Sequence, residues 1–224
     1  GELLACFHEA TAEFSPPGHK PWPRYFAPAD RLPEIVAARD LLRRGMDTGG
    51  LPVAEAERVL DYLETQTRAV EARVPEVRYW DLPQVIVHGD FHHGNIQFYD
   101  VKIAGLFDFD WVSRQPRLVD LADGLIFFGA ERAAPFNPAD LYSLTQAFTL
   151  RPDWVRVFLE PYLARHELTG EERACLGDLI RARWLYMRLE QMQRKLPEQE
   201  RLAFLLREVT VPLQWLDEYE PLLL

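Results

Sequence analysis

The sequence has little cysteine and no long hydrophobic run. Its 224 residues include two cysteines, Cys6 and Cys175, far apart in the chain. So few thiols give no disulfide framework, and the composition predicts a reducing, cytoplasmic setting. No stretch reaches the roughly 18 apolar residues that a membrane-spanning helix needs. No basic segment followed by an apolar run opens the sequence, so we expect neither a secretory signal nor a membrane partner.

Positive charge is also scarce. Lys and Arg number 25 against 35 Asp and Glu, which gives a net charge of −10. A nucleic-acid partner is not expected, because a phosphate backbone needs clustered basic residues. An acidic protein attracts a cationic small substrate at long range, and the same charge also serves solubility alone. Charge therefore leaves both interpretations open.

The remaining composition is that of a soluble globular protein. The apolar fraction is 48% and the charged fraction 27%, both ordinary for such a protein. No internal repeat, low-complexity tract or linker divides the chain. We therefore expect one domain over residues 1–224.

Most of the chain has the apolar spacing of helices, interrupted by proline and glycine. Residues 15–29 are rich in proline and predict an irregular loop. The expected helices cover residues 2–14, 32–44, 53–74, 118–128, 138–149, 152–167, 170–195 and 198–219. Between residues 84 and 109, three short runs rich in β-branched and aromatic residues predict strand, loop, strand, turn and strand. The predicted fold class is α+β, mainly α: a helical bundle with a small β-hairpin region.

The polar motif of this hairpin region is the main indication of chemistry. His88-Gly89-Asp90-Phe91-His92-His93-Gly94-Asn95 lies between the first two predicted strands, and Asp108-Phe109-Asp110 follows the third. Two carboxylates and an amide at strand ends provide a proton acceptor and oxygen ligands for a divalent cation, as phosphoryl transfer requires. A lone Asp90 would be interpreted as a turn residue. With Asn95 and Asp108 beside it, we interpret the motif as a catalytic site.

This motif resembles the aminoglycoside phosphotransferase and choline kinase-like family of protein-kinase-fold enzymes. The likeness extends to residues 1–11, similar to the family's first large-lobe helix, and to Asp120-Leu121-Ala122 beyond the metal-binding Asp. It covers about residues 1–128, and the rest is compatible as a helical tail. The resemblance implies a kinase-like C-terminal lobe and transfer of the γ-phosphoryl group of ATP, with Mg²⁺, to a hydroxyl of a small molecule. Known acceptors in the family include aminoglycosides and amino alcohols.

The resemblance also implies residue roles. Asp90 would be the catalytic base, and Asn95 and Asp108 would bind the Mg²⁺ ion and, through it, the nucleotide. The ring of His88 would bond nearby backbone, and Asp120 would accept backbone N–H groups of the loop. Asp110 is as well explained by a capping or solvated role as by a metal contact.

The sequence departs from the family in lacking a nucleotide clamp. It contains no Gly-x-Gly-x-x-Gly, no Walker-type loop and no Val-Ala-Ile-Lys-like strand lysine, which are the parts that hold ATP. We therefore expect the large lobe only, as a truncated chain without its N-terminal lobe, nearly inactive alone.

Other interpretations remain open at this stage. His92 and His93 invite a zinc site, but consecutive residues rarely converge in the tetrahedral arrangement that zinc requires. Gly89-Asp90-x-His92 echoes two-metal phosphoesterases, although the upstream Asp-x-His of such enzymes is missing. A non-catalytic, pseudokinase-like binding module is the third possibility.

The acceptor itself is not identified by the sequence. The acceptor pocket is expected between the helices of residues 30–75, the catalytic loop and the C-terminal helices, with Trp111 in its wall or in the core. Carboxylates that could bind an amine there, or lie in solvent, are Asp61, Glu64, Asp178 and Glu190.

Overall fold

The computed structural model describes residues 1–15, 24–137 and 139–223. Within these residues the fold is mainly helical with small antiparallel sheets, as predicted. The loop predicted at residues 15–29 lies partly outside the described residues.

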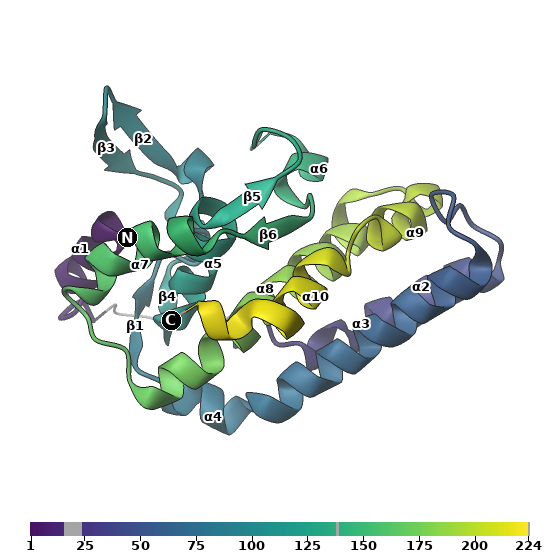
Figure 1. The fold of residues 1–224 in the computed structure, drawn as a ribbon, viewed down its shortest axis with the longest axis horizontal. Helices are drawn as coiled ribbons and strands as arrows, with labels where there is room; N and C mark the ends of the chain where they lie inside the picture. The colour runs from purple at the N-terminus through teal and green to yellow at the C-terminus, as the bar shows by residue number, and fades with distance from the viewer. Residues whose placement is uncertain (16–23, 138, 224) are drawn as a thin grey trace.

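Two groups of helices make up the molecule (Figure 1). Along one side, α2 (Leu32–Arg43) and α3 (Val53–Arg73) pack against α8 (Gly170–Lys195), which also contacts α9 (Glu198–Leu206) and α10 (Val211–Tyr219). At the other end, α1 (Glu2–Ala10) and α5 (Leu118–Phe128) pack on α7 (Pro152–Leu163). The short α4 (Glu76–Asp81) leads into the first strand. Helices α5 and α8 contact each other, so they join the two groups.

Helix α8 is the longest element and begins with a capping box. The Thr169 hydroxyl accepts the N–H of Glu172 at 3.2 Å, and the Glu172 carboxylate accepts the N–H of Thr169 at 2.9 Å. Such reciprocal bonds satisfy N–H groups that the first helical turn leaves without partners. Trp184, Leu185 and Leu189 are fully buried along the helix, so α8 passes through the core.

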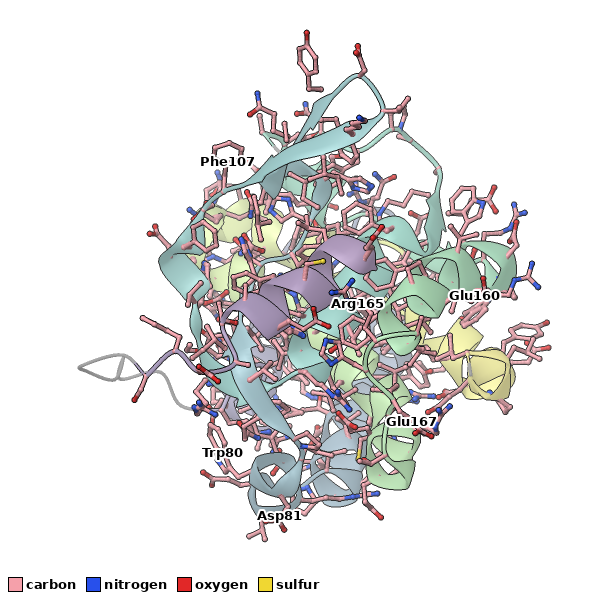
Figure 2. The ribbon with its side chains drawn as sticks, turned by 90° about the vertical axis from the view of Figure 1, so that its left-hand side faces the viewer. Trp80, Asp81, Phe107, Glu160, Arg165 and Glu167 are labelled. Atoms are coloured by element: carbon pink, nitrogen blue, oxygen red, sulfur yellow. The ribbon has the colours of Figure 1, made fainter. Side chains whose placement is uncertain are left out.

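In the part of the chain that the structure describes, the strands form three separate antiparallel pairs. β1 (Gln84–Val87) pairs with β4 (Ser113–Pro116), β2 (Ile96–Tyr99) with β3 (Lys102–Leu106), and β5 (Ala130–Arg132) with β6 (Phe148–Leu150). The β2–β3 hairpin stands away from the helices, with Phe107 near its base (Figure 2). Residues 88–95, here called the catalytic loop after the predicted role of Asp90, therefore leave one strand pair and enter another.

Two of the helix predictions after residue 137 are wrong. Residues 138–149 were expected to be one helix, but the described part contains the four-residue α6 (Leu141–Leu144) and then β6. Phe148 and Leu150 are buried in β6, which pairs with β5, so tertiary packing overrides the local pattern. Residues 198–219 form two helices rather than one, because Glu208 has a φ of 52° after α9. The strands β4, β5 and β6 and the helix α4 were not predicted.

The N-terminal helix is fixed to the rest by polar contacts as well as packing. Arg165, just after α7, donates from Nε to Glu9 of α1 at 2.9 Å (Figure 2).

Within the described residues, none of the helices combines the length and apolar character needed to cross a membrane.

Candidate active site

The second residue of the loop between β1 and β2 must be glycine. Gly89 has a φ of 79°, and a Cβ there would lie 2.7 Å from the carbonyl oxygen of Trp111. Both the left-handed conformation and the close approach exclude a side chain without strain. The turn directs Asp90 outward, so that its side chain is 25% exposed.

Both carboxylate oxygens of Asp90 have partners. Oδ1 lies 3.2 Å from Nη2 of Arg183, and Oδ2 lies 3.3 Å from Nε2 of His92. The Asn95 amide nitrogen donates to the Asp90 carbonyl at 2.8 Å and lies 3.4 Å from Oδ2. His92 Nδ1 accepts the N–H of Gly94 at 3.0 Å, which leaves the ring proton on Nε2, where it donates to Asp90. The carboxylate is thus fixed in orientation.

The charge state of Asp90 follows from these contacts. Burial acts to raise the pKa of Asp90, but the His92 hydrogen bond and the Arg183 charge outweigh it and place the pKa below its ordinary value. Donors to the ionised form and a nearby cation both favour the carboxylate. Asp90 is therefore ionised at neutral pH and can accept a proton.

Asn95 and Asp108 lie at the same end of the β2–β3 hairpin. The Phe107 N–H donates to the Asn95 carbonyl at 2.8 Å, directly beyond the Ile96–Leu106 pair. His88, fully buried, places Nε2 at 2.8 Å from the Phe107 carbonyl. These bonds join the segment before Asp108 to the catalytic loop. The expected bond between the His88 ring and backbone is present.

Asp108 adopts an unusual backbone conformation for a residue with a side chain. Its φ is 61° and its ψ 70°, and it precedes a short 3₁₀ turn, Phe109–Trp111. Its Oδ1 accepts the N–H of Asp110 at 3.5 Å. Non-glycine residues in this region concentrate at functional sites. Asp110 lies in the turn itself, and its role at a metal stays a prediction.

Asp120 is buried in α5 beneath the loop. Its Oδ2 accepts the N–H of His88 at 2.7 Å and its Oδ1 that of Gly89 at 2.8 Å. His8 of α1 adds a third bond, from Nε2 to Oδ2 at 3.0 Å, while its Nδ1 lies 2.9 Å from the Tyr162 hydroxyl. The two backbone bonds expected for Asp120 are present, and His8 and Tyr162 are partners that the sequence did not reveal.

Two further residues of the site were not predicted. Asp123, one turn after Asp120 in α5, accepts Nε of Arg183 and, at 3.3 Å, the N–H of Phe91. Burial raises the pKa of Asp123 to about 7, against the opposing charge of Arg183. The sequence did offer a signal for Asp123, because it is the second Asp in an apolar helix. It offered no signal for Arg183, because the partners of Arg183 are about 60 and 90 residues away.

A cavity of about 590 Å³ opens beside Asp90. Its polar lining includes Asp90, His92, Asp140, Arg183, Glu190 and Lys195, and its aromatic lining includes Phe26, Trp111, Phe127, Tyr142 and Tyr186. A mostly apolar hollow with a few polar groups is the usual form of a small-molecule site. Neither α2 nor α3 contributes a residue to the wall of this cavity, and the expectation that helices of residues 30–75 line the acceptor pocket stays a prediction.

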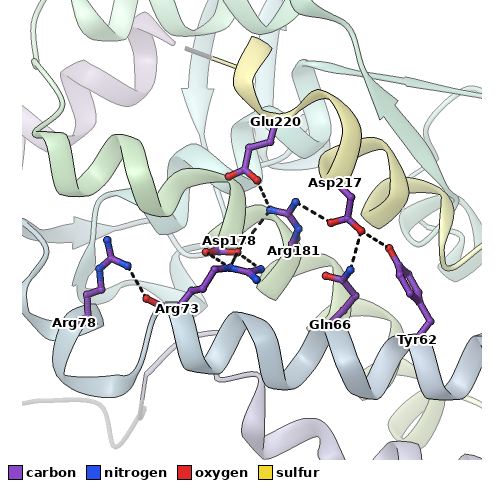
Figure 3. Close-up of polar contacts among 8 residues, drawn as sticks. All are labelled: Tyr62, Gln66, Arg73, Arg78, Asp178, Arg181, Asp217 and Glu220. Atoms are coloured by element: carbon purple, nitrogen blue, oxygen red, sulfur yellow. Dashed lines mark hydrogen bonds and ion pairs between the residues drawn. The ribbon is translucent and has the colours of Figure 1, made fainter.

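The carboxylates considered for an amine are therefore divided. Asp61 and Glu64 pair with Arg39, at 2.8 and 3.0 Å, and Asp178 pairs with Arg73 at 2.7 Å (Figure 3). Glu190 alone of the four lines the cavity, where it also pairs with Arg194 at 3.0 Å.

The donors present suit a magnesium ion bound together with a nucleotide. Among the described residues, no group of three or more His, Cys, Asp or Glu is arranged to bind a metal. Both rings of the His pair are engaged elsewhere: His92 bonds Asp90, and His93 packs on Phe128 at 4.1 Å between ring centres. Asn95 and Asp108 offer oxygen ligands, and Mg²⁺ takes one or two protein ligands, several waters and nucleotide phosphates.

Comparisons with known proteins relate this chain to phosphotransferases. A family model described as "Phosphotransferase enzyme family" matches residues 1–157. A homoserine kinase of Methylobacterium nodulans is 34% identical over 129 residues, which cover 57% of this chain and 37% of the relative. A homoserine kinase of Methylobacillus flagellatus is 26% identical over 133 residues, 58% of this chain and 37% of the relative. The matched region is thus little more than a third of each relative.

Proposed function

Because this chain belongs to the phosphotransferase enzyme family, we propose that its protein transfers the γ-phosphoryl group of ATP to a hydroxyl group of a small molecule. The observation that carries the proposal is the placement of Asp90. Its carboxylate is ionised, oriented at both oxygens, and part of the wall of the cavity. A catalytic base of this reaction class must orient the acceptor hydroxyl and accept its proton.

Asn95 and Asp108 would bind the Mg²⁺ ion. When bound, the ion neutralises charge on the phosphate oxygens of the nucleotide. The bonds from His88 and Asn95 to Phe107 fix Asp108 relative to the loop that presents Asp90. The protein therefore holds the carboxylates of Asp90 and Asp108 in fixed relative positions.

The acceptor is proposed to be an alcohol that carries an amino group. Glu190 and Asp140 supply negative charge to the cavity wall, and Trp111 and Tyr186 supply aromatic faces. Aromatic faces with carboxylates nearby favour an ammonium group. Homoserine, which the relatives' names indicate for those proteins, is the first acceptor to test, followed by amino alcohols and aminoglycosides.

The test is ATP-dependent phosphorylation of these acceptors by the full-length protein and by Asp90→Asn. The substitution keeps the shape of the side chain and removes its charge, so kcat should fall by a factor of about 10²–10⁴. Asp100→Asn is the matched control, because Asp100 is an exposed residue of the β2–β3 turn with a φ of 54°, which asparagine tolerates.

Two results would contradict the proposal. One is full activity of Asp90→Asn. The other is hydrolysis of a chromogenic phosphate ester without ATP and without acceptor phosphorylation, which would favour a phosphoesterase.

Residues 1–224 by themselves are proposed to be nearly inactive. Their sequence contains no glycine-rich phosphate loop, and a kinase-like site needs such a loop to hold ATP. Turnover of residues 1–224 alone at the rate of the full-length protein would contradict this part of the proposal.

A further inference from the structure

Arg183 occupies an unusual place for an arginine. It lies near the middle of α8 and is only 8% exposed. Its guanidinium group lies over the ring of Phe26, 4.6 Å from the ring centre, at the edge of the cavity beside Asp90. Burying a guanidinium group is unfavourable unless its donors are satisfied. Its contacts should therefore explain why it is there.

The guanidinium connects the two carboxylates of the site. Nη2 lies 3.2 Å from Oδ1 of Asp90, and Nε donates to Oδ1 of Asp123. The other oxygen of Asp123 accepts the N–H of Phe91, the residue after Asp90, at 3.3 Å. Asp90 is thus tied to α5 by two routes, one through its side chain and one through the adjoining backbone.

We propose that Arg183 is a positioning residue for the phosphoryl transfer: it fixes Oδ1 of Asp90 relative to α5 and thereby sets where the carboxylate meets the acceptor hydroxyl. The inference rests on the proposed function for its kinetic consequence. That Arg183 and Asp123 order the loop is independent of the reaction.

The planar fork of arginine is necessary for this role. Two nitrogens of one rigid group, Nε and Nη2, reach Asp123 and Asp90 together. A lysine carries the same charge at one point, so it cannot hold both carboxylates at these relative positions. A misplacement of the reacting group by about 1 Å is enough to lower a rate about 100-fold.

Arg181, two residues earlier in α8, provides a matched comparison. It is also nearly buried, and it pairs with Asp217 at 3.1 Å and Glu220 at 2.7 Å (Figure 3). Neither partner belongs to the catalytic loop or lines the cavity. Arg181→Lys therefore disturbs the ion pairs of a buried arginine of the same helix without touching the site.

The experiment compares Arg183→Lys, Asp123→Asn and Arg181→Lys in the full-length protein with ATP, Mg²⁺ and the accepted alcohol. We expect Arg183→Lys to lower kcat by roughly 10- to 100-fold with both KM values within about twofold. Asp123→Asn should lower kcat in the same sense. Arg181→Lys should leave kcat within about twofold even where it lowers the melting temperature as much.

Backbone hydrogen exchange of residues 88–95 gives a readout that needs no activity. It should become faster in Arg183→Lys and Asp123→Asn and stay unchanged in Arg181→Lys. Unchanged exchange in Arg183→Lys would overturn the inference, as would a rise of the acceptor KM at constant kcat, which would make Arg183 a binding residue. Wild-type protein that phosphorylates none of the acceptors would refute the proposed function, while the exchange result would still decide the role of Arg183.

Discussion

Replacement of Asp120 by asparagine tests whether the buried carboxylate fixes the catalytic loop. The carboxylate accepts three hydrogen bonds: from Gly89 at Oδ1, and from His88 and His8 at Oδ2. Asparagine has one acceptor oxygen, and its amide nitrogen is itself a donor. Its better orientation places the oxygen at the Oδ2 site and keeps two bonds. The amide nitrogen then faces the N–H of Gly89, which loses its partner.

The expected loss of stability can be estimated from these bonds. A buried N–H without a partner costs about 1–3 kcal/mol. The two remaining bonds lose their charge assistance, at about 1 kcal/mol each. A neutral amide is easier to bury than a carboxylate, which offsets part of the loss. We expect Asp120→Asn to lower the free energy of unfolding by about 2–4 kcal/mol.

Urea unfolding followed by tryptophan fluorescence measures this change, and amide exchange of Gly89 localises it. Asp100→Asn at the exposed turn should stay within about 0.5 kcal/mol of wild type. If Asp120→Asn also stays within that margin and exchange at Gly89 is unchanged, Asp120 does not fix the loop and the reasoning fails.

Further predictions concern four single positions. Gly89→Ala should cost about 2 kcal/mol or more in urea unfolding, because it adds a clash with Trp111 to an unfavourable φ. Gly50→Ala, at a φ of 88° with open space around it, should cost about 1 kcal/mol. Arg188→Met should lower the free energy of unfolding by about 3–5 kcal/mol, because four backbone carbonyls, three of them buried, lose their donor. Burial lowers the pKa of His93 to about 4, so unfolding takes up a proton between pH 6.5 and 4 and stability falls as pH drops through this range. Because His93 is partly exposed, its replacement by glutamine should remove only roughly 1 kcal/mol of that pH dependence in urea titrations.

Each of these has a clear contrary outcome. Equal losses for the two glycine variants would show that space around Gly89 is not limiting. A stability of Arg188→Met within about 1 kcal/mol of wild type would show that water replaces the guanidinium group. An unaltered pH profile of His93→Gln would place that proton uptake at another residue.

Sequence periodicity located the long helices because local signals and tertiary packing agree there. α2, α3, α5 and α8 begin and end within one residue of the prediction, at prolines, glycines and a cap. β1, β2 and β3 were found because β-branched residues lie next to turn residues. β5 and β6 were missed because their pairing joins residues about 18 positions apart, and short apolar runs do not distinguish helix from strand.

The site was predictable only in its linear motif. Asp90, Asn95 and Asp108 could be singled out because they lie at strand ends at fixed spacing, and their catalytic roles stay predictions. The supporting contacts of Asp120 with His8 required the fold, since α1 and α5 are 112 residues apart at that bond. The same holds for Arg183, whose position in a long amphipathic helix looks like that of any solvent-facing arginine.

Hydrogen bonds close the β2–β3 hairpin at its base, so the length of the hairpin does not affect the geometry of the site. Hydrogen bonds at Phe107 join both ends of the hairpin to the loop, while the tip at Val101 is 93% exposed and distant from those bonds. Residues added at the tip extend a surface turn at little cost, because loop-closure entropy grows slowly with length. The distance from Asp90 to Asp108 is then independent of the number of residues between them. The tip is accordingly the place to insert a spectroscopic label or an affinity tag into this chain.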